Sequence, residues 1–82
     1  MLLGEVLDRL YDSEINFSVS CFWDKGFDVK LGDEMNGYTA ETNVASSEEA
    51  AAWLDAQARR LYPRSQYATG VARPGEAENG HR

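Results

Sequence analysis

The stretch FWDKGFDVKLGDEMNGY, residues 22–38, places two turn signals on either side of an alternating apolar run. Residues 24–26 (DKG) are typical of a three-residue hairpin loop whose glycine adopts a positive φ, and residues 36–37 (NG) are typical of a two-residue type I′ turn. The run between them has apolar residues at every second position: Phe27, Val29 and Leu31. This period is that of a half-buried β-strand, so the stretch predicts two consecutive hairpins that share a central strand.

The same alternation extends beyond this stretch. The preceding segment has apolar residues at its odd positions: Ile15, Phe17, Val19, Cys21 and Trp23. A loop at 24–26 would pair Trp23 with Phe27, and a turn at 36–37 would pair Met35 with Tyr38. Both registers put the apolar residues of the three strands on one side of the sheet. Because a slip by one residue would invert a strand, this agreement favours a three-stranded antiparallel meander.

Asp33 departs from the alternation. The predicted register puts it on the apolar side, opposite Ala40, where an unpaired carboxylate is costly. Two arrangements relieve this cost: a bulge at residues 32–33 that turns Asp33 outward, or a position at the open edge of the core near Phe17. We favour the bulge, because a glycine inside a strand often marks one.

Helical patterns flank the strands. Near the start of the chain, apolar residues recur at steps of three and four, as on one face of a helix: Leu2, Leu3, Val6, Leu7 and Leu10. After the third strand, Ser46 and Glu49 form a capping-box pattern, and Pro63 ends the run that follows. We expect this second helix to cover the middle of the sheet with Trp53. Its apolar stripe contains Ala50, Trp53, Leu54, Ala58 and Leu61.

These elements predict one α+β domain over residues 1–62, in the order helix, three-stranded antiparallel meander, helix, with both helices on one face of the sheet. Trp23 is expected to be largely buried, as is Trp53. Residues 63–82 have weak periodicity and many Gly, Pro and polar residues. We therefore expect a flexible or disordered C-terminal tail, and a chain that ends at Gln66 should keep the fold. Two residues of this tail could still dock on the core, namely Tyr67 and Val71.

The chain of 82 residues carries a formal charge of −6, and the predicted domain is more acidic than the whole. Residues 1–62 hold twelve Asp and Glu against five Lys and Arg, a net charge of −7, whereas residues 63–82 hold two against three, a net charge of +1. Such a field repels phosphate backbones and anionic lipid, which disfavours nucleic-acid and membrane partners, and it favours a basic protein partner. The other interpretation is that the charge serves solubility alone.

Residues that catalysis or metal binding would require are scarce. The sequence contains one histidine, His81, and one cysteine, Cys21, which is expected to point into the core. These two residues cannot form a disulfide, a zinc site or a nucleophile with its base. Acidic residues crowd the hairpins without the spacing of a calcium loop: Asp24, Asp28, Asp33 and Glu34. We therefore expect a protein that is not an enzyme, without cofactor or metal. The first residues lack a signal-peptide pattern and no apolar run reaches membrane-spanning length, so the cytoplasm is the expected location.

The face of the sheet that the helices leave uncovered is the candidate functional surface. Phe22 is expected to stand there as a single exposed aromatic residue beside Asp28, where it would make a reasonable contact anchor. The residues expected to bind a partner are Phe22, Asp28, Lys30 and Glu41. The outer strands also have free edges, and the first strand carries few charges, so a homodimer through an edge strand is a second expected interaction.

The order helix, three antiparallel strands, helix resembles the double-stranded RNA-binding domain over residues 1–62. That family carries a lysine cluster at the start of its last helix, whereas residues 46–49 here read SSEE. The resemblance therefore implies the fold without the binding residues, and a nucleic-acid-binding domain of this topology is the alternative to a protein-binding one. The motif SxSxFWDxGFDVxLGD, residues 18–33, is similar to the core of short uncharacterised bacterial proteins and implies no activity.

Overall fold

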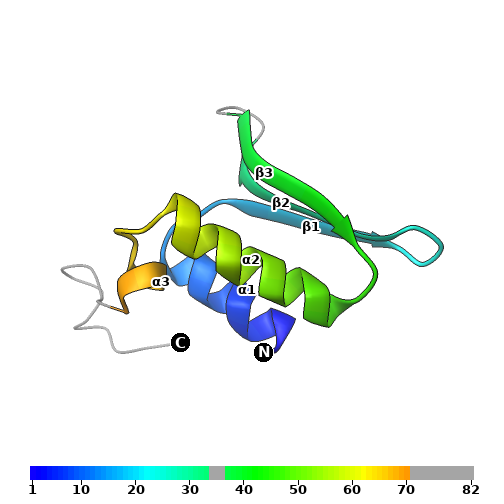
Figure 1. The fold of residues 1–82 in the computed structure, drawn as a ribbon, viewed down its shortest axis with the longest axis horizontal. Coiled ribbons are helices and arrows are strands. Elements are labelled where there is room, and N and C mark those ends of the chain that lie inside the picture. Colours follow the sequence, from blue (N-terminus) through cyan, green and yellow to red (C-terminus); the bar gives the residue numbers. More distant parts are fainter. Residues whose placement is uncertain (34–36, 71–82) are drawn as a thin grey trace.

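The computed structural model describes residues 1–33 and 37–70, and it confirms the predicted α+β class and element order. Helix α1 is followed by three antiparallel strands and helix α2, and a short third helix follows these (Figure 1). The elements are α1 Leu3–Asp12, β1 Phe17–Phe22, β2 Gly26–Asp33, β3 Gly37–Val44, α2 Ser47–Leu61 and α3 Gln66–Thr69.

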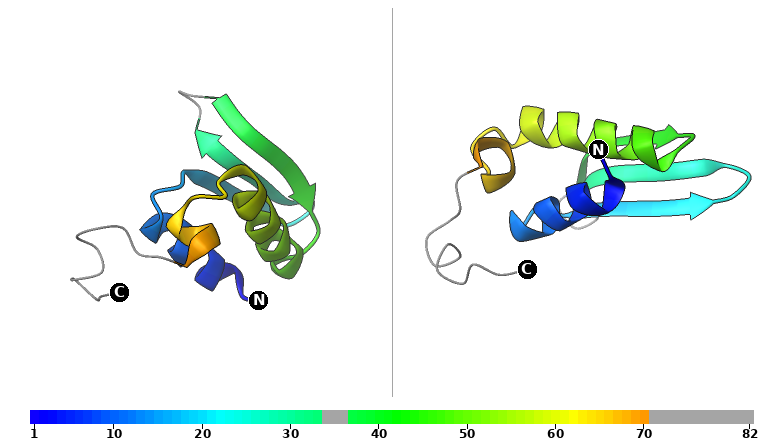
Figure 2. Two further views of the ribbon diagram at one scale, coloured as in Figure 1. Left: turned by 60° about the vertical axis from the view of Figure 1, so that its left-hand side comes forward. Right: turned by 90° about the horizontal axis from the view of Figure 1, so that it is seen from below.

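The molecule has a layer of helices on one face of a three-stranded sheet. The strand order is β1-β2-β3, and α2 packs against β2 and β3 while α1 packs against α2 (Figures 1 and 2). The core lies between the two layers and consists of Val6, Leu10, Ile15, Val29, Leu31, Ala50, Ala51, Leu54, Ala58 and Tyr67. Three of these residues are alanines of α2, and their small side chains bring the helix close to the sheet. The opposite face of the sheet is left uncovered by every described element (Figure 1).

The register of both hairpins differs by two residues from the predicted one. Cys21 pairs with Phe27, so the first loop consists of residues 23–25 rather than 24–26. Val29 pairs with Thr42, where the predicted turn would have placed Val44. Because the shift is even as far as Leu31, the strands keep their faces up to that residue, and Val29 and Leu31 still point into the core.

The sheet has an irregularity beside the predicted position, but its extra residue lies on β3 and not at residues 32–33 of β2. Leu31 pairs with Ala40 but Gly32 pairs with Tyr38, so the register shifts between Leu31 and Gly32, with Thr39 as the extra residue on β3. Asp33 is therefore opposite Gly37, and its predicted pairing with Ala40 is wrong. The direction of the Asp33 side chain and the predicted type I′ turn at Asn36 lie outside the described residues.

The end of the first hairpin extends past the helices, which corrects two predictions of burial. Trp23 is 95% exposed and Cys21 is exposed, although both were expected in the core. The shorter strand explains this difference, because Trp23 belongs to the loop and Cys21 lies in the last pair but one of the ladder. This end of the hairpin extends past α2 (Figure 1). Trp53 was expected to be largely buried and is half-buried against the core.

Both helices begin close to their predicted starts. The α1 helix buries Val6 and Leu10, whereas Leu2, expected on the apolar face, precedes the helix as its N-cap and is exposed. At α2, the Ser46 hydroxyl accepts a hydrogen bond from the Glu49 amide at 3.2 Å. The Glu49 carboxylate accepts one from the Ala45 amide at 3.3 Å, so the predicted capping box forms with its return bond shifted by one residue.

The folded chain continues beyond residue 62, which the sequence interpretation placed in a tail. Helix α3 packs against both α1 and α2, and it buries Tyr67 to 1% exposure. A chain that ends at Gln66 would lack Tyr67, the largest fully buried side chain among the described residues, so its truncation stays a prediction that remains to be measured. Val71 and the residues after it lie outside the described residues.

The exposure of Trp23 gives a first testable prediction. We expect Trp23→Ala to change the free energy of unfolding by less than about 0.5 kcal/mol, because an exposed loop side chain loses little contact when it is truncated. A Trp53→Phe variant leaves Trp23 as the only tryptophan, and its fluorescence should be quenched by acrylamide as strongly as that of a free indole. A destabilisation by Trp23→Ala similar to that of a core substitution, or a protected fluorophore, would show that the loop packs on the domain.

Candidate partner-binding site

The uncovered sheet face is built from the even-numbered residues of β1 and β2 and their partners on β3. One cross-strand row contains Ser18, Lys30 and Glu41, the next contains Ser20, Asp28 and Asn43, and the row nearest the loop contains Phe22 opposite Gly26. All four residues expected to bind a partner, namely Phe22, Asp28, Lys30 and Glu41, therefore lie on this face. We call it the outer face.

Asn43 fixes the polar part of the outer face. Its side-chain amide donates a hydrogen bond to the Asp28 carboxylate at 2.7 Å and another to the Lys25 carbonyl oxygen at 3.0 Å. These contacts connect β3 to β2 and to the first loop. The Asp28 carboxylate is thus held in one orientation while it remains exposed to solvent.

The apolar part of the outer face lies at the hairpin end. Phe22 is 62% exposed, and its cross-strand partner is Gly26, which has no side chain to cover it. Trp23 follows at 95% exposure, so two consecutive aromatic residues are open to solvent. Sequence reasoning found Phe22 and missed Trp23, because the alternation was read one residue too far. The letters DKG fit a loop at 24–26 or one at 23–25, and only the second makes Trp23 a loop residue, so the sequence alone carried no signal that decided between them.

Lys30 and Glu41 are cross-strand neighbours in the central row. Opposite charges at such positions attract each other, although the gain at a solvent-exposed site is small. Lys30 is half-buried and Glu41 is exposed. The described charges of the outer face are therefore two carboxylates and one ammonium group, with Glu41 and Asp28 in adjacent rows.

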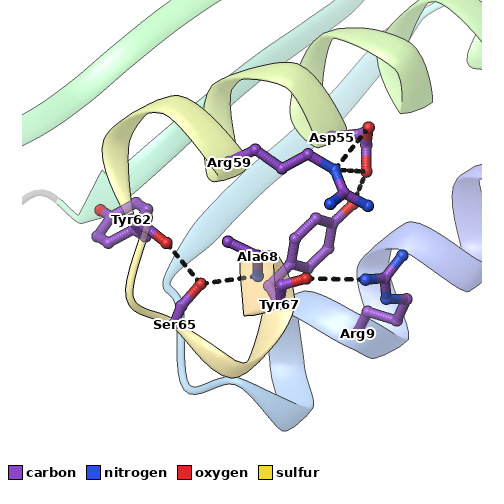
Figure 3. A network of polar contacts seen from close by, with 7 residues as sticks. All are labelled: Arg9, Asp55, Arg59, Tyr62, Ser65, Tyr67 and Ala68. Atoms are coloured by element: carbon purple, nitrogen blue, oxygen red, sulfur yellow. Dashed lines mark hydrogen bonds and ion pairs between the residues drawn. The ribbon is translucent and has the colours of Figure 1, made fainter. Parts of the chain in front are cut away.

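A second polar cluster lies on the helical side, around Tyr67 (Figure 3). The Tyr67 hydroxyl donates a hydrogen bond to the Asp55 carboxylate at 2.8 Å, and Arg59 pairs with the same carboxylate at 3.1 Å. Arg9 of α1 donates to the Tyr67 carbonyl oxygen at 2.8 Å, and its guanidinium lies 4.3 Å from the centre of the ring. Ser65 caps α3 by accepting a hydrogen bond from the Ala68 amide at 3.1 Å.

This cluster fastens α3 to the domain and is a poor candidate for chemistry. Burial, followed by the hydrogen bond to Asp55, raises the pKa of Tyr67 far above its ordinary value, so the phenol stays protonated at physiological pH and is no nucleophile. The adjacent hollow has a volume of about 180 Å³ and is lined by Arg9, Asp12, Ser13, Gln66, Tyr67 and Gly70. Ligand pockets usually exceed about 300 Å³, so this hollow is small for a substrate.

Other kinds of site have no support in the described chain. Within residues 1–33 and 37–70, no group of three His, Cys, Asp or Glu side chains is placed to hold a metal ion. None of the helices found there combines the length and the hydropathy that a bilayer crossing needs. Comparison with protein families, curated proteins and solved structures found no match for this chain.

Proposed function

We propose that this protein is a small non-enzymatic binding module that engages a basic protein partner through its outer face, with Phe22 as the anchor. The observation that carries the proposal is the 62% exposure of Phe22 on a sheet face that the described helices leave open. Trp23 extends the same apolar surface to the end of the hairpin. Aromatic residues of this kind supply most of the energy at the centres of protein interfaces.

The polar surroundings of Phe22 suit a basic partner. Asp28 is already oriented by Asn43, so little side-chain entropy would be lost when a lysine or arginine binds it. The formal charge of −6 would attract such a partner over a distance and raise the rate of encounter. The apolar anchor would then supply affinity, while the carboxylates select the charge of the partner.

The proposal is tested by affinity capture from a lysate of the native cell. We expect wild-type protein to retain a basic protein that the double variant Phe22→Ala, Asp28→Lys does not retain, with affinity reduced by about 30-fold or more when measured on the purified partner. The matched control is Tyr11→Ala, Glu5→Lys, which removes one exposed aromatic residue and reverses one charge on α1.

Equal recovery by the two double variants would remove the outer face from consideration. If nuclease treatment abolishes the capture, or if the protein shifts duplex RNA at low salt, the nucleic-acid alternative replaces this proposal.

A further inference from the structure

The free edge of β1 lacks the features that usually protect an edge strand. β1 lies at one end of the sheet, and its sequence FSVSCF contains no charged residue, no proline and no glycine. Proteins commonly protect such edges with charges, prolines or bulges. The β3 edge has two of these devices, the irregularity at Thr39 and the charge of Glu41. Among the residues that the structure describes, β1 is therefore the edge that is open to pairing.

The hydrogen bonds of the first hairpin show which backbone groups of β1 face outward. The Gly32 amide donates to the Asn16 carbonyl oxygen at 2.8 Å, and the Lys25 amide donates to the Phe22 carbonyl oxygen at 2.8 Å. The even-numbered residues of this segment thus direct their backbone groups toward β2. Since neighbouring residues of a strand point their backbone groups in opposite directions, the odd-numbered residues Phe17, Val19 and Cys21 point theirs to the free edge.

We propose that a second copy of this chain pairs antiparallel with β1 in the register that places Val19 opposite Val19 of the other copy. This register aligns all three outward-facing residues, with Phe17 opposite Cys21 on each side of the twofold axis. It forms about six backbone hydrogen bonds, two for each aligned pair. A register centred on Ser18 or Ser20 aligns only two of the three residues with one another.

The side chains of β1 complement each other in this register. On the helical side, Phe17 of one copy would be the cross-strand neighbour of Cys21 of the other copy. Cys21 is exposed in the single chain. On the outer side, Ser18 would face Ser20, so two small uncharged residues meet. Two copies that each carry a charge of −6 therefore join without opposing any carboxylates across the new pair of strands. This lack of charge is the reason that a second copy, rather than a charged partner, fits the edge.

The dimer goes beyond the proposed function, because it uses the edge of β1 and not the outer face. Its sheet would be continuous over six strands, with the helices of both copies on one side. The two outer faces would then form one surface that presents Asp28 and Glu41 twice. A partner with repeated basic segments would gain avidity from this arrangement.

Sedimentation of the full-length chain over a range of concentrations tests the dimer. We expect a monomer–dimer equilibrium for the wild type and for Cys21→Ser, and a monomer for Cys21→Pro at every concentration. Proline at position 21 removes an outward-facing amide and leaves the bonds to β2 in place, so the fold should persist, as circular dichroism would show. A monomeric wild type, or dimerisation of Cys21→Pro equal to that of Cys21→Ser, would overturn the proposal.

Disulfide trapping tests the register. In the Cys21→Ser background, an oxidised mixture of the Ser18→Cys and Ser20→Cys proteins should yield at least several-fold more cross-linked dimer than either protein alone. Opposite residues bring their Cβ atoms within disulfide range, whereas residues two positions apart stay about 7–8 Å apart. Equal cross-linking by one protein alone would contradict the Val19 register. Unchanged dimerisation of Phe22→Ala, Asp28→Lys would separate this result from the binding test of the outer face.

Discussion

Replacing Tyr67 with alanine is expected to lower the free energy of unfolding by about 3–5 kcal/mol, as other large-to-small aromatic changes in cores do. Tyr67 is 1% exposed and is the largest fully buried side chain among the described residues. Its helix α3 packs against α1 and α2, so truncation leaves a cavity where three helices meet. A chain of this size has a total stability of only about 4–12 kcal/mol. Denaturant unfolding followed by circular dichroism would measure the loss.

The matched control is Tyr11→Ala. Tyr11 is 66% exposed on α1, so the same substitution there should cost less than about 1 kcal/mol. If the two variants are equally stable, α3 is not part of the cooperative core. The cooperatively folded domain would then end at residue 62, as the sequence predicts.

The variant Tyr67→Phe separates packing from hydrogen bonding. It keeps the ring and removes the donor to Asp55, which should cost about 1.5–3 kcal/mol because the acceptor is charged. The difference in the free energy of unfolding between wild type and Tyr67→Phe should fall as the pH rises. Burial first, and the Asp55 hydrogen bond second, raise the pKa of the folded phenol above the value of about 10 of an unfolded tyrosine.

The protonated phenol therefore stabilises the native state fully below about pH 10. Above that pH the unfolded chain loses the proton first, and this part of the stability falls by about 1.4 kcal/mol per pH unit. The advantage of wild type over Tyr67→Phe should narrow from pH 10 upward. A constant difference across this range would show that the Tyr67 hydroxyl is not held as Figure 3 shows.

The faces of the sheet could be predicted from the sequence, but the pairing of individual residues could not. Alternation with period two assigns Val29 and Leu31 to the core, and this assignment holds for every register that differs by an even number. The loop length decides among those registers. The same letters DKG fit a loop at 24–26 or one at 23–25 that closes with Gly26, and the structure has the second. As far as Leu31, the prediction thus failed by two residues without misplacing a face.

Helix α3 could not be predicted because its stability comes from distant residues. A four-residue helix is too short to show a hydrophobic period, and Tyr67 depends on Arg9 and Asp55, which are far from it in the chain. Only its ends carry local signals, since Ser65 is a good N-cap and Gly70 a good C-cap. The exposure of Phe22 could be predicted, because it follows from the alternation. The exposure of Trp23 and Cys21 could not, because it depends on the loop register and on how far the helices extend over the hairpin.

Gly26→Ala is expected to lower the free energy of unfolding by about 2–4 kcal/mol, for two reasons that add. Gly26 has a φ of +81°, a region that costs an alanine about 1–2 kcal/mol. A Cβ atom built on it would also lie 2.5 Å from the Val44 carbonyl oxygen, so the backbone of β3 would have to move. Val44 ends β3 just before α2, and the hairpin end is therefore fixed against the strand that leads into the helix.

The same substitution at two other glycines separates these causes. Gly4→Ala in α1 meets no atom within 4 Å and should stabilise the protein by about 0.5–1 kcal/mol, because alanine favours a helix. Gly70 has a φ of +76° and open space around it. Gly70→Ala should therefore lower the free energy of unfolding by the backbone strain alone, about 1–2 kcal/mol. Thermal or denaturant unfolding should therefore show that Gly4→Ala gains stability, and that Gly70→Ala and Gly26→Ala lose stability by unequal amounts. If Gly26→Ala costs no more than Gly70→Ala, the contact with Val44 is absent in solution; the hairpin end that carries Phe22 and Trp23 would then be free to move relative to α2.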